Sequence, residues 1–205
     1  GFIFNNTLVN ADGAARCAVG NCVFNEQADN GLNGSAIRMT GASHMLVINN
    51  EFNASQGNVI GTFDWDNVTI DGNHFTNCWQ PVSIDQGTDR MRGRNIRYVR
   101  NIQSGARRAG FETGGDVSDG GPGQYFLDLL IDDNWFVDLG KVVPDGAAPV
   151  SIVARANVGT KVTKNFFRLG TTNPGMYAEA IEIYGAVEVS GNLIEDFAAP
   201  FAVYG

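Results

Sequence analysis

The sequence predicts an all-β solenoid of short, stacked parallel strands, and three observations support this fold class. A segment of the form apolar–x–apolar–x–x–Asn–x–apolar recurs along the chain of 205 residues. Glycine is abundant, with 26 residues, and proline is scarce, with 6, which suits many tight turns between short strands. Long segments with a helical period near 3.6 are missing. Self-similarity at intervals of roughly 20–50 residues is typical of repeat architectures, and each unit here is strand-like.

The recurring segment is clearest in four places. These are residues 68–75, 129–136, 160–167 and 187–194, with Asn73, Asn134, Asn165 and Asn192 as their asparagines. Weaker copies end at Asn6, Asn21, Asn50 and Asn101. Asn6 and Asn21 are only 15 residues apart, so we expect one of them to lie outside the regular pattern. We expect each repeated Asn to adopt the left-handed backbone conformation and to bond its amide to the next unit.

A second strand precedes each Asn segment. Its copies lie at residues 36–41, 58–61, 82–85, 109–113, 150–153, 180–185 and 201–205. Most copies alternate apolar and polar residues, so one face is predicted to be buried and the other to face solvent. The predicted unit is therefore a strand, a corner, a strand ending in Asn, and a second corner. Stacked units pair in parallel, about 4.8 Å apart. The apolar residue two positions after the Asn then points inside, as for Phe52, Phe75, Phe136, Phe167 and Ile194.

This arrangement resembles the right-handed parallel β-helix of the pectin-lyase-like superfamily, which includes polysaccharide lyases, some glycoside hydrolases and phage tailspikes. The resemblance covers nearly the whole chain and concerns the repeat, since no catalytic signature of the family is present. It implies a single domain over residues 1–205, an all-β right-handed parallel β-helix of about seven rungs. Because the periodic pattern is cut at both ends, we expect a segment of a longer chain. The resemblance also implies a polysaccharide partner, an extracellular or virion-surface location and, for the tailspike type, a homotrimer.

Charge and composition disfavour several function classes. Lys and Arg number 14 against 22 Asp and Glu, a net charge of −8, which argues against a nucleic-acid partner. No apolar run approaches the roughly 20 residues of a membrane-spanning helix. Cys17, Cys22 and Cys78 are odd in number and lack metal-ligand spacing, so we interpret them as small buried thiols. We expect no cofactor, with calcium as an open alternative because residues 114–116 are one isolated fragment of a calcium-binding repeat.

A functional site in a solenoid is expected where the unit length varies. The long insertions are residues 86–95 and 114–127 after the first strand of the unit, and 102–108, 138–149 and 168–179 after the second. We expect the two sets to form the walls of a groove over the first strands. By alternation, the outward residues of that floor are Ser83, Asp85, Glu112, Ser151, Glu182 and Tyr184.

Three carboxylates on this floor are the predicted catalytic residues: Asp85, Glu112 and Glu182. Asp85 and Glu112 would lie on adjacent rungs about 5 Å apart, and Glu112 and Glu182 two rungs apart, about 10 Å. Retaining glycosidases place their carboxyl groups about 5–5.5 Å apart and inverting ones about 6.5–9.5 Å. Both pairs therefore stay open as the acid and its base or nucleophile. A carboxyl buried beside another would have the raised pKa that a general acid needs.

A lyase would use the basic residues instead. Seven of the fourteen basic residues lie between Arg90 and Arg108, and arginine binds carboxylates bidentately. The predicted substrate-binding residues are Arg90, Arg92, Arg94, Arg107, Arg108, Arg155, Tyr184 and Trp79. Neutralising a uronate carboxylate would acidify its C5 proton for removal. The alternative to both enzymes is a non-catalytic β-helix, either a carbohydrate-binding adhesin or a structural shaft, in which outward charges only keep the surface solvated.

The positions directly after the Asn form one more pattern. Ile102, Trp135, Phe166 and Leu193 occupy them on four successive units. If they point outward, they make an apolar stripe of the kind that mediates subunit association.

Overall fold

The computed structural model describes residues 1–26, 35–61, 64–84, 92–106, 108–113, 125–139, 148–152, 156–169 and 179–204. Within these ranges the chain is all-β, with strands and no helix. The strands form three parallel sheets, which we call sheets A, B and C. The all-β class and the parallel pairing predicted from the repeat are confirmed.

Sheets A and B have eight strands each. Sheet A contains β1 (Ile3–Asn5), β4 (Val23–Asn25), β7 (Glu51–Asn53), β10 (His74–Thr76), β13 (Ile102–Ser104), β16 (Trp135–Leu139), β20 (Phe166–Leu169) and β23 (Leu193–Glu195). Sheet B contains β2 (Val9–Asn10), β5 (Ile37–Arg38), β8 (Asn58–Gly61), β11 (Gln80–Ile84), β14 (Phe111–Thr113), β17 (Val150–Ile152), β21 (Glu179–Tyr184) and β24 (Ala199–Tyr204).

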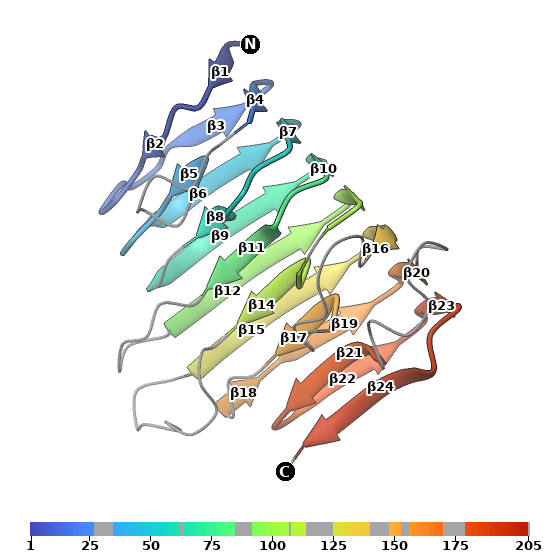
Figure 1. The fold of residues 1–205 in the computed structure, drawn as a ribbon. Coiled ribbons are helices and arrows are strands. Elements are labelled where there is room, and N and C mark those ends of the chain that lie inside the picture. The colour runs from blue at the N-terminus through green and yellow to red at the C-terminus, as the bar shows by residue number, and fades with distance from the viewer. Residues whose placement is uncertain are drawn as a thin grey trace.

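Sheet C is formed by the strands that end at the Asn positions. It contains β3 (Ala18–Gly20), β6 (Ser43–Ile48), β9 (Trp65–Asp71), β12 (Arg92–Val99), β15 (Tyr125–Asp132), β19 (Thr160–Thr163) and β22 (Val187–Ser190), and β18 (Ala156–Val158) pairs with the start of β15. The chain visits sheets A, B and C in this order again and again, and each strand pairs with its counterpart one pass later (Figure 1). This topology is compatible with a parallel β-helix, and we call one pass a rung.

Sheet A is the element that the sequence did not predict. The expected unit has two strands, whereas each rung has a third, short strand directly after the Asn. Its middle residue points inward and its flanking residues point outward, as in β7, where Phe52 is buried and Glu51 is exposed. Three residues are too few to show an alternation, so the sequence predicts a corner there instead of a strand. In addition, β12 and β15 begin at Arg92 and Tyr125, so the predicted insertions at 86–95 and 114–127 end inside sheet C.

A ladder of asparagine side chains joins the rungs at the corner between sheets C and A. Its members are Asn50, Asn73, Asn101, Asn134, Asn165 and Asn192. At a typical step, the side-chain oxygen of Asn134 accepts both the backbone N–H (2.9 Å) and the side-chain amide (3.1 Å) of Asn101. The Asn101 amide also donates back to the carbonyl of Ile70, at 3.0 Å. Each Asn thus connects the rungs on both sides of it.

The left-handed conformation belongs to the residue before the ladder Asn, which corrects the expectation. Asn49 (φ 52°) precedes Asn50, and Asp133 (φ 56°) precedes Asn134. Asn21 occupies this left-handed position (φ 55°), so the ladder position of its rung is Cys22, whose N–H donates to Asn50 at 3.0 Å. Asn6 lies at the other end of sheet A, after β1. Neither early Asn is a ladder member, which explains their close spacing.

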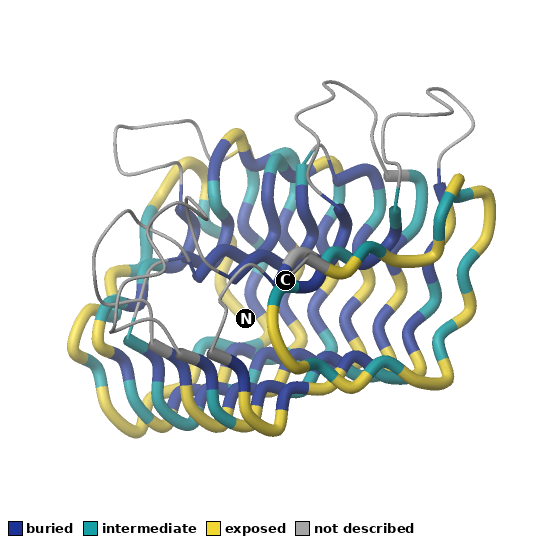
Figure 2. The backbone as a smooth tube through the Cα atoms, turned by 90° about the horizontal axis from the view of Figure 1, so that it is seen from below, coloured by how far each residue is buried: buried dark blue, intermediate teal, exposed yellow. Residues whose placement is uncertain are grey.

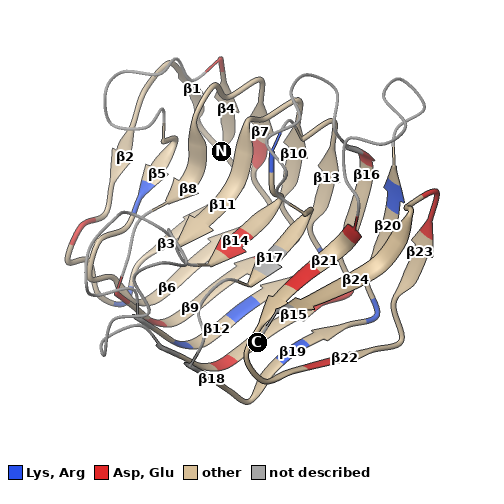
Figure 3. Ribbon diagram, turned by 60° about the horizontal axis from the view of Figure 1, so that its bottom comes forward, with Lys and Arg blue, Asp and Glu red and all other residues tan. Residues whose placement is uncertain are grey.

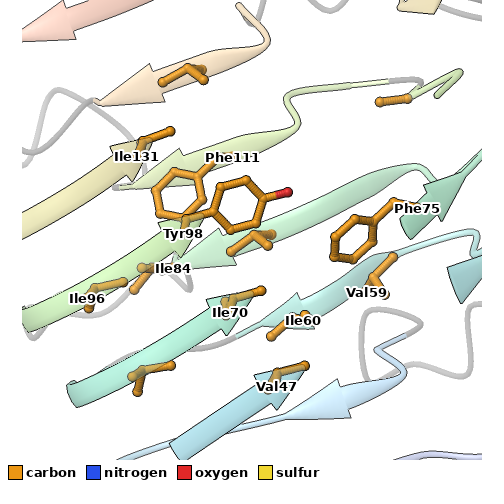
Figure 4. Packing of buried hydrophobic residues seen from close by; sticks show 14 of the residues in the cluster. Val47, Val59, Ile60, Ile70, Phe75, Ile84, Ile96, Tyr98, Phe111 and Ile131 are labelled. Carbon is orange, nitrogen blue, oxygen red and sulfur yellow. The ribbon is translucent and has the colours of Figure 1, made fainter. Parts of the chain in front are cut away.

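Inside the rungs, like residues stack on like. The phenylalanines of sheet A form a column, with ring centroids 4.8 Å apart for Phe4 and Phe24 and 4.9 Å for Phe52 and Phe75. Aliphatic side chains from sheets B and C fill the rest of the interior (Figure 4). In the tube view, buried and exposed positions alternate along the coils (Figure 2). The apolar residue two positions after the Asn was predicted to point inward, and this is confirmed for Phe52, Phe75, Phe136 and Phe167, which are buried.

One polar cluster interrupts the phenylalanine column. Gln103 takes the place of a phenylalanine, is fully buried, and donates to the Tyr98 hydroxyl and to the Gly110 carbonyl. Tyr98 packs on Phe111 with ring centroids 5.1 Å apart (Figure 4). Burial raises the pKa of Tyr98 far above its ordinary value, so the phenol stays neutral. A Cβ at Gly110 would lie 1.9 Å from Gln103 Oε1, so any other residue there would displace the buried Gln103 side chain.

The expectation of small buried thiols is correct for two of the three cysteines. All three are free thiols, but only Cys22 and Cys78 are buried, and Cys17 is exposed. Trp65 belongs to the core, since it is 2% exposed and its indole N–H donates to Met39 O. In the described ranges no helix has the length and apolar character to span a bilayer.

The ladder predicts a large cost for removing one of its members. Asn134→Ala would leave the buried N–H of Asn101 without its acceptor and would remove one hydrogen bond to the carbonyl of Tyr98. An unsatisfied buried group costs about 1–3 kcal/mol, and a lost hydrogen bond about 0.5–1.5 kcal/mol. We expect the free energy of unfolding, measured in denaturant, to fall by about 2–5 kcal/mol. Asn53→Ala is the matched control, because Asn53 bonds Asn25 on the outer surface; a similar loss in both variants would contradict the role of the ladder.

Candidate functional site

Sheet B brings four of the predicted floor residues into one column, namely Ser83, Glu112, Ser151 and Glu182. The strand register aligns Ser83 with Glu112, Glu112 with Ser151, and Ser151 with Glu182. Glu112 and Glu182 therefore lie two strands apart in the same column, as the repeat predicted. Acidic positions on β14 and β21 are visible on this face in Figure 3. The register comes from the alternation of the strands, which is why the sequence could predict it.

Glu112 is the centre of a hydrogen-bonded network on β14. It is only 6% exposed. Arg108 approaches it with both terminal nitrogens, Nη1 3.0 Å from Oε2 and Nη2 3.3 Å from Oε1. The side-chain amide of Gln80 donates to the same Oε2, and Arg108 Nη1 also donates to Gln80 Oε1 at 2.9 Å. The three side chains form a closed triangle, because each one bonds the other two.

The same network contains the backbone of Trp79. The N–H of Arg108 donates to Trp79 O at 2.8 Å, and Trp79 N–H donates to Ser55 O at 2.8 Å. Arg108, a predicted binding residue, thus contacts the predicted catalytic Glu112, and the backbone of Trp79, another predicted binding residue, contacts Arg108. Gln80 was not predicted. The sequence shows only a polar residue at the start of a strand. The structure shows that all five residues of this strand are buried.

The second carboxylate of the column, Glu182, has a different neighbour. The Tyr184 hydroxyl donates to Glu182 Oε1 over 3.4 Å, and both side chains are half-buried. The Tyr184 carbonyl accepts the Asn157 amide at 2.9 Å, which fixes the end of β21 to the neighbouring segment. A predicted catalytic residue, Glu182, and a predicted substrate-binding residue, Tyr184, thus contact each other.

The remaining predicted residues lie elsewhere or outside the described residues. Arg94 is on β12 of sheet C, where its Nε is 3.0 Å from Asp66 Oδ1 and the side chain is 59% exposed. It is therefore on a different sheet from Glu112. Arg92 begins the same strand. Asp85, Arg90, Arg107 and Arg155 lie outside the described residues, so the pair of Asp85 and Glu112 has no described geometry.

The arrangement favours an ionised Glu112. A guanidinium that donates two hydrogen bonds stabilises the charged carboxylate. Such a group can act as a base, a nucleophile or an acceptor for sugar hydroxyls, whereas the general acid of a glycosidase must hold a proton. Glu182 instead accepts a hydrogen bond from the Tyr184 hydroxyl, at 3.4 Å. The two carboxylates of the column thus have different surroundings.

For metal binding, the described part of the chain contains no group of three or more His, Cys, Asp or Glu side chains that could hold an ion. The isolated calcium-type fragment at 114–116 lies outside the described residues.

No protein-family model matches the chain, and no curated protein and no solved structure is significantly similar to it. The likeness to the pectin-lyase-like superfamily therefore stays a prediction from the repeat.

The triangle around Glu112 predicts a coupling between Arg108 and Glu112. Arg108→Gln would leave a nearly buried carboxylate without its cation, and we expect unfolding to become easier by about 1–3 kcal/mol. The double change with Glu112→Gln should recover part of this loss, as a double-mutant cycle in denaturant would show. Arg94→Gln is the control, because exposed pairs contribute about 0–1 kcal/mol. Additive effects of the two changes would contradict the network.

Proposed function

We propose that the chain is a right-handed parallel β-helix of about seven rungs, of the pectin-lyase-like type, which acts on a polysaccharide along the outer face of sheet B. The observation that supports this most is the single column that contains Glu112 and Glu182 two strands apart. A linear polymer lying across the strands would meet both carboxylates. The proposal places the protein outside the cell or on a virion surface, where such polymers occur.

The proposed reaction is hydrolysis with inversion. Two strand spacings separate the backbones by about 10 Å, and side chains leaning toward each other reach the separation of about 6.5–9.5 Å that inverting enzymes use. Glu182 is the general acid that protonates the glycosidic oxygen. Glu112, kept ionised by Arg108, is the general base that takes a proton from water as the water oxygen attacks the anomeric carbon and the glycosidic bond breaks. Tyr184 orients Glu182.

Hydrolysis is preferred to β-elimination because Arg108 already bonds Glu112 and Gln80. A lyase needs a guanidinium directed at the substrate carboxylate. In a lyase, this guanidinium would have to come from Arg90, Arg107 or Arg155, which lie outside the described residues.

The second candidate is a non-catalytic carbohydrate-binding or structural β-helix, an adhesin or a shaft. The 6% exposure of Glu112 favours it, since a catalytic carboxylate must reach its substrate. The outer face of sheet A also suits a shaft that assembles as a homotrimer. Ile102, Trp135 and Leu193 are 41%, 54% and 57% exposed on three rungs of one column. Exposed apolar stripes of this kind mark association surfaces.

A polymer panel separates these functions. We expect the wild-type protein to release new reducing ends from one polymer. Glu112→Gln and Glu182→Gln should each lower the rate by about 10²–10⁴-fold, the usual contribution of a general acid or base. Glu195→Gln, an exposed change on sheet A, is the control. The unfolding midpoint of each variant shows whether the fold is intact.

The products decide among the alternatives. Unsaturated uronate products would show that the reaction is β-elimination and not hydrolysis. Binding of a polymer with no product would support the adhesin, and absence of both binding and product from every polymer would contradict the proposed function.

A further inference from the structure

A hollow lies on sheet C, on a different sheet from the Glu112 network. Its volume is about 360 Å³, within the range of about 300–1,000 Å³ typical of ligand sites. Its lining residues are Asn67, Thr69, Asn95, Arg97, Asp128, Leu130, Gly159 and Lys161. They come from β9, β12, β15 and the segment from β18 to β19, so the hollow crosses four rungs along the stacking direction.

The hollow follows a line of left-handed residues. Asn67, Asn95, Asp128 and Gly159 have φ values of 54°, 51°, 57° and 71°. Asn67, Asn95 and Asp128 are not among the aligned residues of the strand pairs, although the residues on either side of them are. The regular pairing is therefore interrupted at these positions. A left-handed residue turns an extended strand sharply, so four of them in line crease the sheet. We call this feature the sheet C crease.

Polar groups line the crease in a regular order. The Asn95 side-chain amide donates to Asn67 Oδ1 at 3.1 Å, and the Asn67 amide donates to Asp66 Oδ1 at 2.9 Å. Beside this row, the register places Thr69, Arg97, Leu130 and Lys161 in one outward column. The crease therefore offers hydrogen-bonding groups at the rung spacing of about 4.8 Å.

The charges around the crease are mostly paired between rungs. Arg94 pairs with Asp66 at 3.0 Å, Arg100 pairs with Asp71, and Lys161 pairs with Glu188 at 2.8 Å. Such exposed pairs mainly keep the surface solvated.

Arg97 and Asp128 are the exceptions. Both side chains are exposed, and neither makes a hydrogen bond or an ion pair within the part of the chain that the structure describes. The column neighbours of Arg97 are Thr69 and Leu130, which offer no carboxylate. A guanidinium and a carboxylate are thus available to a ligand in the same hollow.

We propose that the sheet C crease binds a linear glycan that carries carboxylate groups, as a binding site separate from sheet B. Arg97 donates two hydrogen bonds to a sugar carboxylate. Asp128 and the Asn95 carbonyl accept from sugar hydroxyls, and a chain of sugars lies along the stack over about 14 Å, three rung intervals. This binding requires no catalysis and does not rest on the activity proposed for Glu112 and Glu182.

The test measures binding of oligogalacturonate and oligomannuronate, and of their carboxyl-reduced counterparts, by calorimetry. We expect the protein to bind one of the two acidic oligosaccharides at least about tenfold more tightly than its reduced form, as one charge-assisted contact provides. Arg97→Gln should weaken binding about tenfold or more, and Asp128→Asn should weaken it less. Arg100→Gln is the matched control, an exposed arginine of the same strand region that is already paired with Asp71. Glu195→Gln, an exposed change on sheet A, should bind as wild type does.

Three results would overturn the proposal. The first is equal affinity for acidic and reduced oligosaccharides, or no binding of any. The second is the same loss in Arg97→Gln and Arg100→Gln, which would indicate diffuse surface charge. The third is loss of binding in Glu112→Gln with none in Arg97→Gln, which would assign the binding to sheet B. The unfolding midpoints of all variants are compared, so that a folding defect is not taken for lost binding.

Discussion

The hydrogen bond from one asparagine to the side-chain oxygen of the next is the interaction on which the rest of the structure depends. Parallel strands a rung apart could slip past each other, and a slip of one residue would turn every core side chain outward. The ladder prevents this, because each side-chain oxygen accepts two hydrogen bonds from the preceding rung, as Asn165 does from Asn134 at 3.0 and 2.9 Å. These groups are buried, so an unpaired one is costly. The ladder therefore fixes the register at the corner between sheets C and A, and the alignment of the other strand positions depends on it.

Fixed register makes columns, and the columns produce the chemistry of each face. On sheet B, the column places Glu112 and Glu182 two strands apart. On sheet A, it collects Ile102, Trp135 and Leu193 into an apolar stripe. On sheet C, left-handed residues align into the crease beside Arg97. The three faces thus have an acidic, an apolar and a mixed polar character, although they are built from the same repeating unit.

The sequence predicted the features that depend on period and register. Alternation gave the sheet B strands and the column of Ser83 and Glu112, and the repeated Asn gave the ladder. It missed the strands of sheet A because three residues show no period, and it placed the left-handed residue one position late because Asn tolerates that conformation. The triangle of Gln80, Arg108 and Glu112 was missed because it joins side chains from different rungs. The crease was missed because it is formed by residues of different types, glycine, asparagine and aspartate, which share only the left-handed backbone conformation. A repeat search compares residue types and does not detect a shared conformation.

Amide hydrogen exchange of the ladder residues tests most directly whether the ladder holds the rungs in register. The backbone N–H groups of Asn73, Asn101 and Asn134 each donate to the side-chain oxygen of the next asparagine, at 2.9–3.0 Å. Exchange there requires the rungs to separate, so we expect these amides to be among the slowest in the chain, far slower than that of the exposed turn residue Thr7. Exchange of the three amides at the rate of Thr7 would contradict the account.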